Sequence, residues 1–378
     1  MSEGQRLFVV LGMHRSGTSA ITRALKALGV DLGDNLMGSA SGENDKGFWE
    51  DNDIYQLDVE LLNGAGHDWH TLSPVLPEHL DERDARSHLA EAAAMLRGKL
   101  AASGRFGMKD PRLPRLLPFW QAVFTHLQAE VDYLIVVRHP LSVARSLQRR
   151  NGFALEKSLH LWFQHMWSAL AQSADESRVV VDYDAIVDAP LPQLQRMAQQ
   201  LRLPFAPDAA TTQEYVDEFL DAGLRHDRHA PEDLQLVDGV PGFVMQMYDL
   251  LTDLAADRLA LDDPRVARTV AELGGAFREH TGCWRFMDAC ERNVAQGHRA
   301  VAESVMAIER LQAELSAEQQ LAGALREHVA HEQRQVASLA ALREEALRAI
   351  AEKDAQLVRH ARQIMDLSGQ LAAVQARA

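Results

Sequence analysis

The stretch RLFVVLGMHRSGTS, residues 6–19, decides the fold of this chain. Residues 6–12 form an apolar run ending in glycine, which predicts a buried strand, and residues 18–28 have the pattern of a helix. Backbone N–H groups at a helix start, aided by the helix dipole, bind anions. Two glycines permit a tight wrap around a phosphate. Further donors are the side chains of Arg15, Ser16, Thr18 and Ser19. The stretch therefore predicts a phosphate-binding loop.

The residue after the second glycine of this loop distinguishes between phosphate ligands. A nucleoside triphosphatase loop has Lys there, to reach the β- and γ-phosphates. This chain has Thr18, and its cation is Arg15, two residues before Gly17. No convincing apolar strand ends in an Asp that is paired to a magnesium-binding Ser or Thr. A P-loop nucleotide kinase or hydrolase therefore remains only the alternative function.

The rest of the body alternates strand and helix patterns. Residues 131–137 and 179–181 are β-branched apolar runs, and a helix is expected from about Leu141. Residues 80–100 and 158–171 have helical periodicity. This alternation predicts an α/β fold, a P-loop-like three-layer parallel sheet with helices on both faces. Ligands of such sheets bind beyond the carboxyl ends of the strands.

Two motifs resemble the sulfotransferase family, whose donor is 3′-phosphoadenosine 5′-phosphosulfate (PAPS). The family's first signature is a strand, loop and helix in which Lys or Arg precedes Ser-Gly-Thr, as Arg15 does here. The second is an Arg at a strand end with a Ser eight residues on, which bind the 3′-phosphate. Arg138 and Ser146, in RHPLSVARS, match it in identity and spacing. Pro140 starts the helix, Ser146 lies about two turns along it, and Arg supplies a charged fork to a doubly charged phosphate.

Three weaker stretches extend the resemblance over residues 6–230. Met108–Arg112 (MKDPR) is similar to a Lys-Asp-Pro segment of several carbohydrate and protein-tyrosine sulfotransferases. Gly47–Glu50 (GFWE) resembles a segment of bacterial members, and residues 219–226 weakly resemble a later one. The resemblance implies a PAPS-dependent transferase of the bacterial, carbohydrate type. It says nothing about the tail.

The resemblance also implies which residues bind the donor and how the transfer proceeds. The donor-binding set is His14, Arg15, Ser16, Gly17, Thr18, Ser19, Arg138 and Ser146. An acceptor hydroxyl attacks sulfur in line, so catalysis needs positioning, cations at the leaving oxygen and a base. Arg15 is the expected leaving-group cation and Lys109 the second, although Lys109 could instead pair with Asp110. Neither a metal nor a covalent intermediate is required.

The general base is the least constrained assignment. A buried carboxylate with a raised pKa could take the acceptor proton. Glu50 of the GFWE segment is the first candidate and Glu43 the second. Asp110 and a histidine are the remaining candidates. The histidines are His14, His67 and His70.

Composition limits the other kinds of ligand. With 39 Lys+Arg and 54 Asp+Glu the net charge is −15, which argues against nonspecific binding to nucleic acid or anionic membranes. The pairs His67/His70 and His226/His229 lack further zinc ligands, and Cys283 and Cys290 form neither a zinc spacing nor a disulfide framework. No metal is expected. With no signal peptide or membrane-length apolar run, the expected location is the cytoplasm.

The tail differs in composition from the body. All 13 prolines precede residue 265, and residues 297–378 are rich in Ala, Glu, Gln, Leu and Arg. Two columns of every seventh residue run through the tail. The column from Val329 is mostly apolar, and the column from Leu325 is about half apolar. The sequence predicts a sulfotransferase domain over residues 1–296, with the motifs in 6–230 and a helical remainder in 231–296. Residues 297–378 are expected to form a coiled coil for self-association or a partner helix, or a helix folded back on the body.

The acceptor is expected to be a hydroxyl of a carbohydrate or glycolipid, since bacterial-type relatives act mainly on sugars. A third hypothesis is a PAPS-binding scaffold that has lost catalysis. The intact set Arg15, Lys109, Arg138 and Ser146 argues against that loss.

Overall fold

The computed structural model describes residues 5–39, 46–75, 82–220 and 227–376. The chain divides into two compact units, Met1–Glu291 and Arg292–Ala378. The first unit is built on a fully parallel sheet of order β2-β1-β3-β4. Its strands are β1 (Arg6–Leu11), β2 (Arg105–Lys109), β3 (Glu130–Val137) and β4 (Ser177–Asp182).

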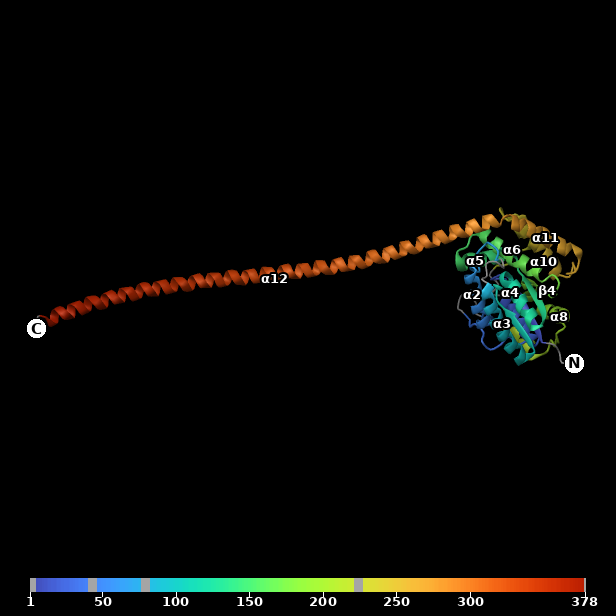
Figure 1. The fold of residues 1–378 in the computed structure, drawn as a ribbon, viewed down its shortest axis with the longest axis horizontal. Coiled ribbons are helices and arrows are strands. Elements are labelled where there is room, and N and C mark those ends of the chain that lie inside the picture. Colours follow the sequence, from blue (N-terminus) through green and yellow to red (C-terminus); the bar gives the residue numbers. More distant parts are fainter. Residues whose placement is uncertain (1–4, 40–45, 76–81, 221–226, 377–378) are drawn as a thin grey trace. The chain divides into compact units, whose positions relative to one another are not determined.

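Helices cover both faces of this sheet, which confirms the expected three-layer α/β fold (Figure 1). One face packs mainly against α2 (Asn52–Gly64), α3 (Glu82–Ser103), α4 (Leu113–Leu127), α5 (Pro140–Asn151), α6 (Leu155–Gln172), α10 (Gly242–Ala255) and α11 (Pro264–Glu279). The other packs against α1 (Thr18–Ala27), α7 (Tyr183–Asp188), α8 (Pro190–Gln200) and the π-helix Glu214–Phe219. The short helices α9 (Ala210–Gln213) and Pro231–Leu236 complete the described elements of this unit.

The apolar runs in the strands follow from this double coverage. Leu7, Val9 and Leu11 of β1 point into one core, and Phe8 and Val10 point into the other. Because both faces of such a strand are buried, it has no solvent-facing polar residues, and its sequence is a continuous apolar run.

Strand β2 is the element that the sequence pattern does not reveal. It reads RFGMK, and an interior glycine normally weakens a strand. Here a Cβ on Gly107 would lie 2.8 Å from Leu32 Cδ2 and 3.2 Å from Val30 Cγ1, so the glycine allows close packing of β2 against residues 30–32, which follow α1. The β2 strand places Lys109 at the same sheet edge as the two predicted phosphate motifs.

The strand register aligns the carboxyl ends of all four strands. Val10 lies beside Lys109, Leu11 beside Ile135, and Val137 beside Asp182. The chain connects β1 to β2, its neighbour on one side, through α1–α3. It then connects β2 to β3, the neighbour of β1 on the other side, by a crossover through α4. Loops on the two sides of such a switch diverge and leave room for a ligand.

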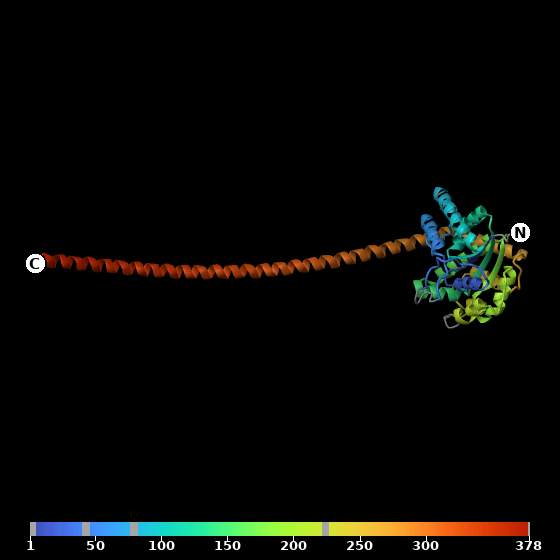
Figure 2. The same cartoon turned by 90° about the horizontal axis from the view of Figure 1, so that it is seen from below.

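The last helix, α12 (Thr281–Gln375), begins in the first unit and forms the described part of the second. Its buried side chains are Trp284 and Asp288, both in the first unit. Residues 292–375 form one uninterrupted helix (Figure 2). Of the helices described, α12 included, none has both the length and the hydrophobicity that a membrane span requires.

Buried histidines of the first unit should make its stability depend on pH. His165 on α6 lies with Nδ1 2.7 Å from Leu161 O, and burial, with the charge of Arg115 second, lowers the pKa of His165 to about 3. Between pH 6.5 and 3 the unfolded chain binds a proton here and the folded chain does not, so stability falls as pH drops below 6.5. At pH 5 this one group costs about 2 kcal/mol.

Urea unfolding at pH 6.5 and pH 5.0 measures this loss. A His165→Gln variant should lose about 2 kcal/mol less than the wild type between the two pH values, whatever its own stability. The other histidines are common to both proteins and cancel. An equal loss in both proteins would show that His165 does not stay neutral in the fold.

Candidate functional site

The loop between β1 and α1 has the geometry of an anion cradle. Gly17, the N-cap residue of α1, has φ +84°, no side chain caps the helix, and its first turn holds no acidic residue. Arg15 also has a positive φ, of 67°. Within this turn Ala20 N–H donates to Gly17 O over 3.0 Å. A helix start without a side-chain cap or an acidic residue is suited to an anion.

Packing explains why the second glycine of this loop must be a glycine. A Cβ at Gly17 would lie 2.0 Å from Cδ2 of Tyr183, the first residue of α7 after β4. A Cβ at Gly12 would lie 2.7 Å from Thr18 Cγ2 and 3.2 Å from Val136 O of β3. The loop is thus held directly against the ends of β3 and β4.

The structure joins the two predicted phosphate motifs into one site. Arg15 Nε donates to Ser146 Oγ over 2.8 Å, and Arg138 Nη1 donates to Arg15 O over 2.9 Å. The Arg138 guanidinium also lies 4.7 Å from the centre of the Tyr183 ring. Residues 123 and 131 positions apart in sequence therefore meet beyond the carboxyl ends of β1 and β3.

Several buried polar atoms around this junction have no hydrogen-bond partner among the described residues. They are Ser16 Oγ in the loop, Arg138 Nε, and Ser142 Oγ on α5, and both serines are fully buried. A buried polar atom without a partner carries a free-energy penalty, so native proteins seldom keep one without a reason. Phosphate oxygens accept several hydrogen bonds at once, so these donors fit a ligand that carries phosphates.

Lys109, at the end of β2, lies beside the loop but is already paired. Its Nζ donates to Glu50 Oε1 over 2.7 Å and to Phe48 O over 2.9 Å, and lies 3.4 Å from Ser19 Oγ. Lys109 and Glu50 are 3% and 5% exposed. The structure therefore brings together three predicted site residues, Lys109, Glu50 and Ser19. Glu43 lies outside the described residues.

The other carboxylates near Lys109 are held by different partners. Asp110 accepts two bonds of 3.1 Å from Arg112 Nη1, so the Lys109–Asp110 pair considered from the sequence does not form. Burial raises the pKa of Asp110 to about 6, and Arg112 opposes that rise. Asp58, bound by Trp120 Nε1, is fully buried, and burial followed by the charge of Asp110 raises its pKa well above the usual range.

His14 of the loop is buried and neutral. Burial lowers its pKa well below the usual value, with Arg112 the largest of the neighbouring charges that add to this effect. Its Nε2 has no hydrogen-bond partner among the described residues. The ring lies 4.2 Å, centre to centre, from that of Trp69. A neutral imidazole in the loop can bind a ligand or accept a proton.

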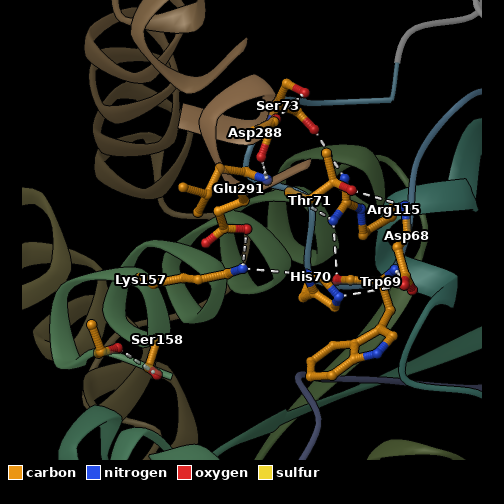
Figure 3. Close-up of polar contacts among 12 residues, drawn as sticks. Asp68, Trp69, His70, Thr71, Ser73, Arg115, Lys157, Ser158, Asp288 and Glu291 are labelled. Carbon is orange, nitrogen blue, oxygen red and sulfur yellow. Dashed lines mark hydrogen bonds and ion pairs between the residues drawn. The ribbon is translucent and has the colours of Figure 1, made fainter. Parts of the chain in front are cut away.

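Residues 68–73 include Trp69, which packs on His14 of the loop, and hydrogen bonds hold this segment in position (Figure 3). The buried Arg115 donates to the carbonyl oxygens of Trp69, Thr71 and Ser73 over 3.0, 2.6 and 2.9 Å. Asp288, from the start of α12, accepts from Leu72 N, Ser73 N and Ser73 Oγ. The first turns of α12 thus help to position Trp69, whose ring packs on His14.

The remaining predicted positions make other contacts. His70 Nδ1 lies 3.2 Å from Lys157 Nζ, and the His70 ring lies 5.2 Å, centre to centre, from that of Phe153. Among the described residues, no group of three or more His, Cys, Asp or Glu side chains has the arrangement of a metal site. The pair His226/His229 is described only at His229, and Cys283 and Cys290 are exposed free thiols.

Sequence reasoning missed two residues beside the predicted phosphate motifs. Ser142 is one turn before Ser146 on α5, and the four-residue spacing of the two hydroxyls was the available signal. Tyr183 packs on both Gly17 and Arg138, and its position at the end of a predicted strand was the only hint.

A scan against protein-family models finds no match, and a search of curated proteins finds no significant relative. Among solved structures, the chain is similar to the sulfotransferase domain from the Synechococcus PCC 7002 olefin synthase. The identity is 16%, the TM-score is 0.36, and the match covers 74% of this chain and 96% of that one. It is also similar to the sulfotransferase domain from the curacin biosynthetic pathway, with 15% identity, a TM-score of 0.33 and coverage of 72% and 98%. At this identity the likeness is one of fold only.

Proposed function

We propose that this chain is a sulfotransferase that moves the sulfuryl group of PAPS to a hydroxyl acceptor. The observation that carries the proposal is the meeting of Arg15, Arg138 and Ser146 at the carboxyl edge of the sheet. Two phosphate-binding motifs that lie far apart in sequence form one continuous site. A donor with phosphates at both its 5′ and 3′ positions needs such a double site.

The donor would be held by two groups of side chains. Arg138, Ser142 and Ser146 would bind the 3′-phosphate, because they combine a guanidinium with hydroxyls on one face of α5. Ser146 accepts from Arg15, so its own O–H is free to donate to a phosphate oxygen. Residues 14–19 would bind the 5′-phosphosulfate with backbone N–H groups and the hydroxyls of Ser16, Thr18 and Ser19.

The transfer would be an in-line displacement. The acceptor oxygen forms a bond to sulfur while the bond from sulfur to the bridging oxygen breaks, and that oxygen takes the electron pair. The charges of Arg15 and Lys109 would stabilise the oxygen as it becomes negative. The acceptor proton goes to a base on the opposite side of the sulfur.

Glu50 is the proposed base, held in place by Lys109. A Glu50→Gln variant keeps the size of the side chain and its hydrogen bond to Lys109 but cannot take up a proton. We expect kcat to fall about 100-fold to 10,000-fold, the usual range for a lost general base, with little change in PAP affinity. PAP is adenosine 3′,5′-bisphosphate, the desulfated product.

Two comparison variants make this test specific. Glu60→Gln, at an exposed position of α2 ten residues after Glu50, should leave kcat unchanged. His14→Asn removes the neutral imidazole of the loop, the other group able to accept the proton. Full activity in Glu50→Gln, together with loss of activity in His14→Asn, would show that His14 and not Glu50 is the general base.

The acceptor is proposed to be a carbohydrate hydroxyl. Trp69, beside His14, and Phe153 are half-buried with ring centres 5.6 Å apart. Arg150 lies over the Trp69 ring and Lys157 over the Phe153 ring. Half-exposed aromatic rings with polar neighbours are suited to contact a sugar ring. Transfer of radiolabelled sulfate from PAPS to a panel of saccharides, glycolipids, phenols and tyrosine peptides tests this. Labelling of saccharides or glycolipids is expected. Labelling of phenols alone would refute the acceptor class, and no labelling together with tight PAP binding would favour the scaffold.

A further inference from the structure

The second unit exposes a long, mostly apolar seam. We define the seam as two columns of α12: every seventh residue from Val301 to Leu371, and every seventh residue from Ser304 to Val374. The first column is Val, Ile or Leu except at Ala322 and Arg343. Large apolar side chains of the seam are about half exposed or more, for example Val329 at 48% and Val374 at 65%. A helix with such a stripe, repeated every seven residues, is stabilised by packing against another helix.

Charged residues interrupt the seam and restrict the possible partners. Arg343 lies in the first column, and Glu318, Glu332 and Lys353 lie in the second. In a parallel, in-register pair of identical helices each of these faces its own copy. Four layers of the interface would then hold two like charges each, which is unfavourable in a partly desolvated seam.

An antiparallel pair of the same helices removes this conflict. When one helix is reversed, both columns stay in the seam only if the first column of one copy faces the second column of the other. In the register that places Arg343 opposite Glu332 of the second copy, Val336 faces Leu339, Ile350 faces Leu325, and Val301 faces Val374. The whole seam overlaps, and the Arg343–Glu332 pair occurs twice by symmetry.

The remaining charges also fit this register. Glu318 faces Leu357, and Lys353 of the second copy lies opposite Ala322, one helical turn from Glu318. The two opposite charges are thus in successive layers, and their long side chains can reach each other at the edge of the seam. None of the four charged seam residues faces a like charge.

We propose that the α12 helices of two copies of this chain form an antiparallel coiled-coil homodimer, centred between Ala337 and Ser338. The occupant of the seam is a second copy because this one sequence supplies both halves of each ion pair. The proposal does not depend on the chemistry of the first unit.

Charge reversal in the full-length protein tests the pairing. By analytical ultracentrifugation the wild type should be a dimer at micromolar concentration. Arg343→Glu should raise the dimer dissociation constant at least tenfold, and the double variant with Glu332→Arg should bring it back to within about threefold of the wild type. Arg334→Glu, the same charge change on the face opposite the seam, is the matched control and should change it less than twofold.

Spin-label distances test the direction of the helices. Single labels are placed at Ala313→Cys and Ala341→Cys, with the exposed Cys283 and Cys290 replaced by Ser. At 1.5 Å per residue, antiparallel copies place the 313 labels about 75 Å apart and the 341 labels about 20–25 Å apart. A parallel coil would place both pairs about 20 Å apart.

Each outcome decides the proposal. A dimer with a long 313 distance, a short 341 distance and charge-swap recovery supports it. A monomer, a higher oligomer, two short distances or no recovery in the double variant overturns it. A monomer would leave the seam to a helix of another protein.

Discussion

Replacing Arg138 by alanine should lower the affinity for PAP about 100-fold or more. Arg138 Nη1 donates to the loop carbonyl of Arg15 over 2.9 Å, and its buried Nε lacks a partner among the described residues. Loss of a buried charged donor to a doubly charged phosphate corresponds to about 3 kcal/mol. Calorimetric titration with PAP measures the change.

Two controls separate recognition of the 3′-phosphate from damage to the fold. AMP lacks that phosphate, so it should bind the wild type and the Arg138→Ala variant with the same, weaker affinity. Arg145→Ala, on an exposed position of the same helix, should bind PAP like the wild type. An Arg138→Ala variant that loses AMP and PAP affinity in equal proportion would show a structural role only.

Gly17→Ala should be the most damaging change to the loop itself. The new Cβ meets the Tyr183 ring at 2.0 Å, and the residue has φ +84°, where a side chain is strained. Strain and overpacking together cost about 2–5 kcal/mol of the free energy of unfolding. PAP affinity should fall as well, because the loop and the Tyr183 ring, which packs on Arg138, cannot both keep their positions. Urea unfolding and calorimetry measure the two effects.

Gly29 is the matched control for this change. It has φ +79°, but an added Cβ would have no atom within 4 Å, so Gly29→Ala should cost only the backbone term of about 1–2 kcal/mol. Adding Tyr183→Ala to Gly17→Ala should recover part of the stability without restoring PAP affinity. Equal destabilisation by the two single glycine changes would contradict the packing explanation.

The sequence predicted the parts of the site that are encoded locally. The predicted phosphate loop consists of adjacent residues, from the end of β1 to the first turn of α1. The Arg138–Ser146 motif is also local and runs from the residue after β3 into α5. Their meeting follows from the parallel sheet, because carboxyl ends of neighbouring strands share one edge. The three-layer α/β fold could therefore be predicted before any contact was known.

Contacts between segments distant in sequence could not be predicted in the same way. The Lys109–Glu50 pair depends on β2, whose glycine hides the strand pattern, and on the placement of residues 46–50 beside it. Asp288 reaches residues 72 and 73 across 216 and 215 positions, and no local pattern marks it as a buried carboxylate. Such pairings are determined by packing and desolvation in the folded protein, which cannot be inferred from a single sequence.

One site at the carboxyl edge of the sheet is proposed to bind both phosphate groups of PAPS. Calorimetric titration of the wild-type protein with PAP, with ATP plus magnesium as the comparison, tests this proposal. We expect tight PAP binding without added metal and much weaker binding of ATP. Preference for ATP with magnesium, or no binding of PAP, would contradict it and favour a nucleotide kinase or hydrolase or a protein that binds no nucleotide.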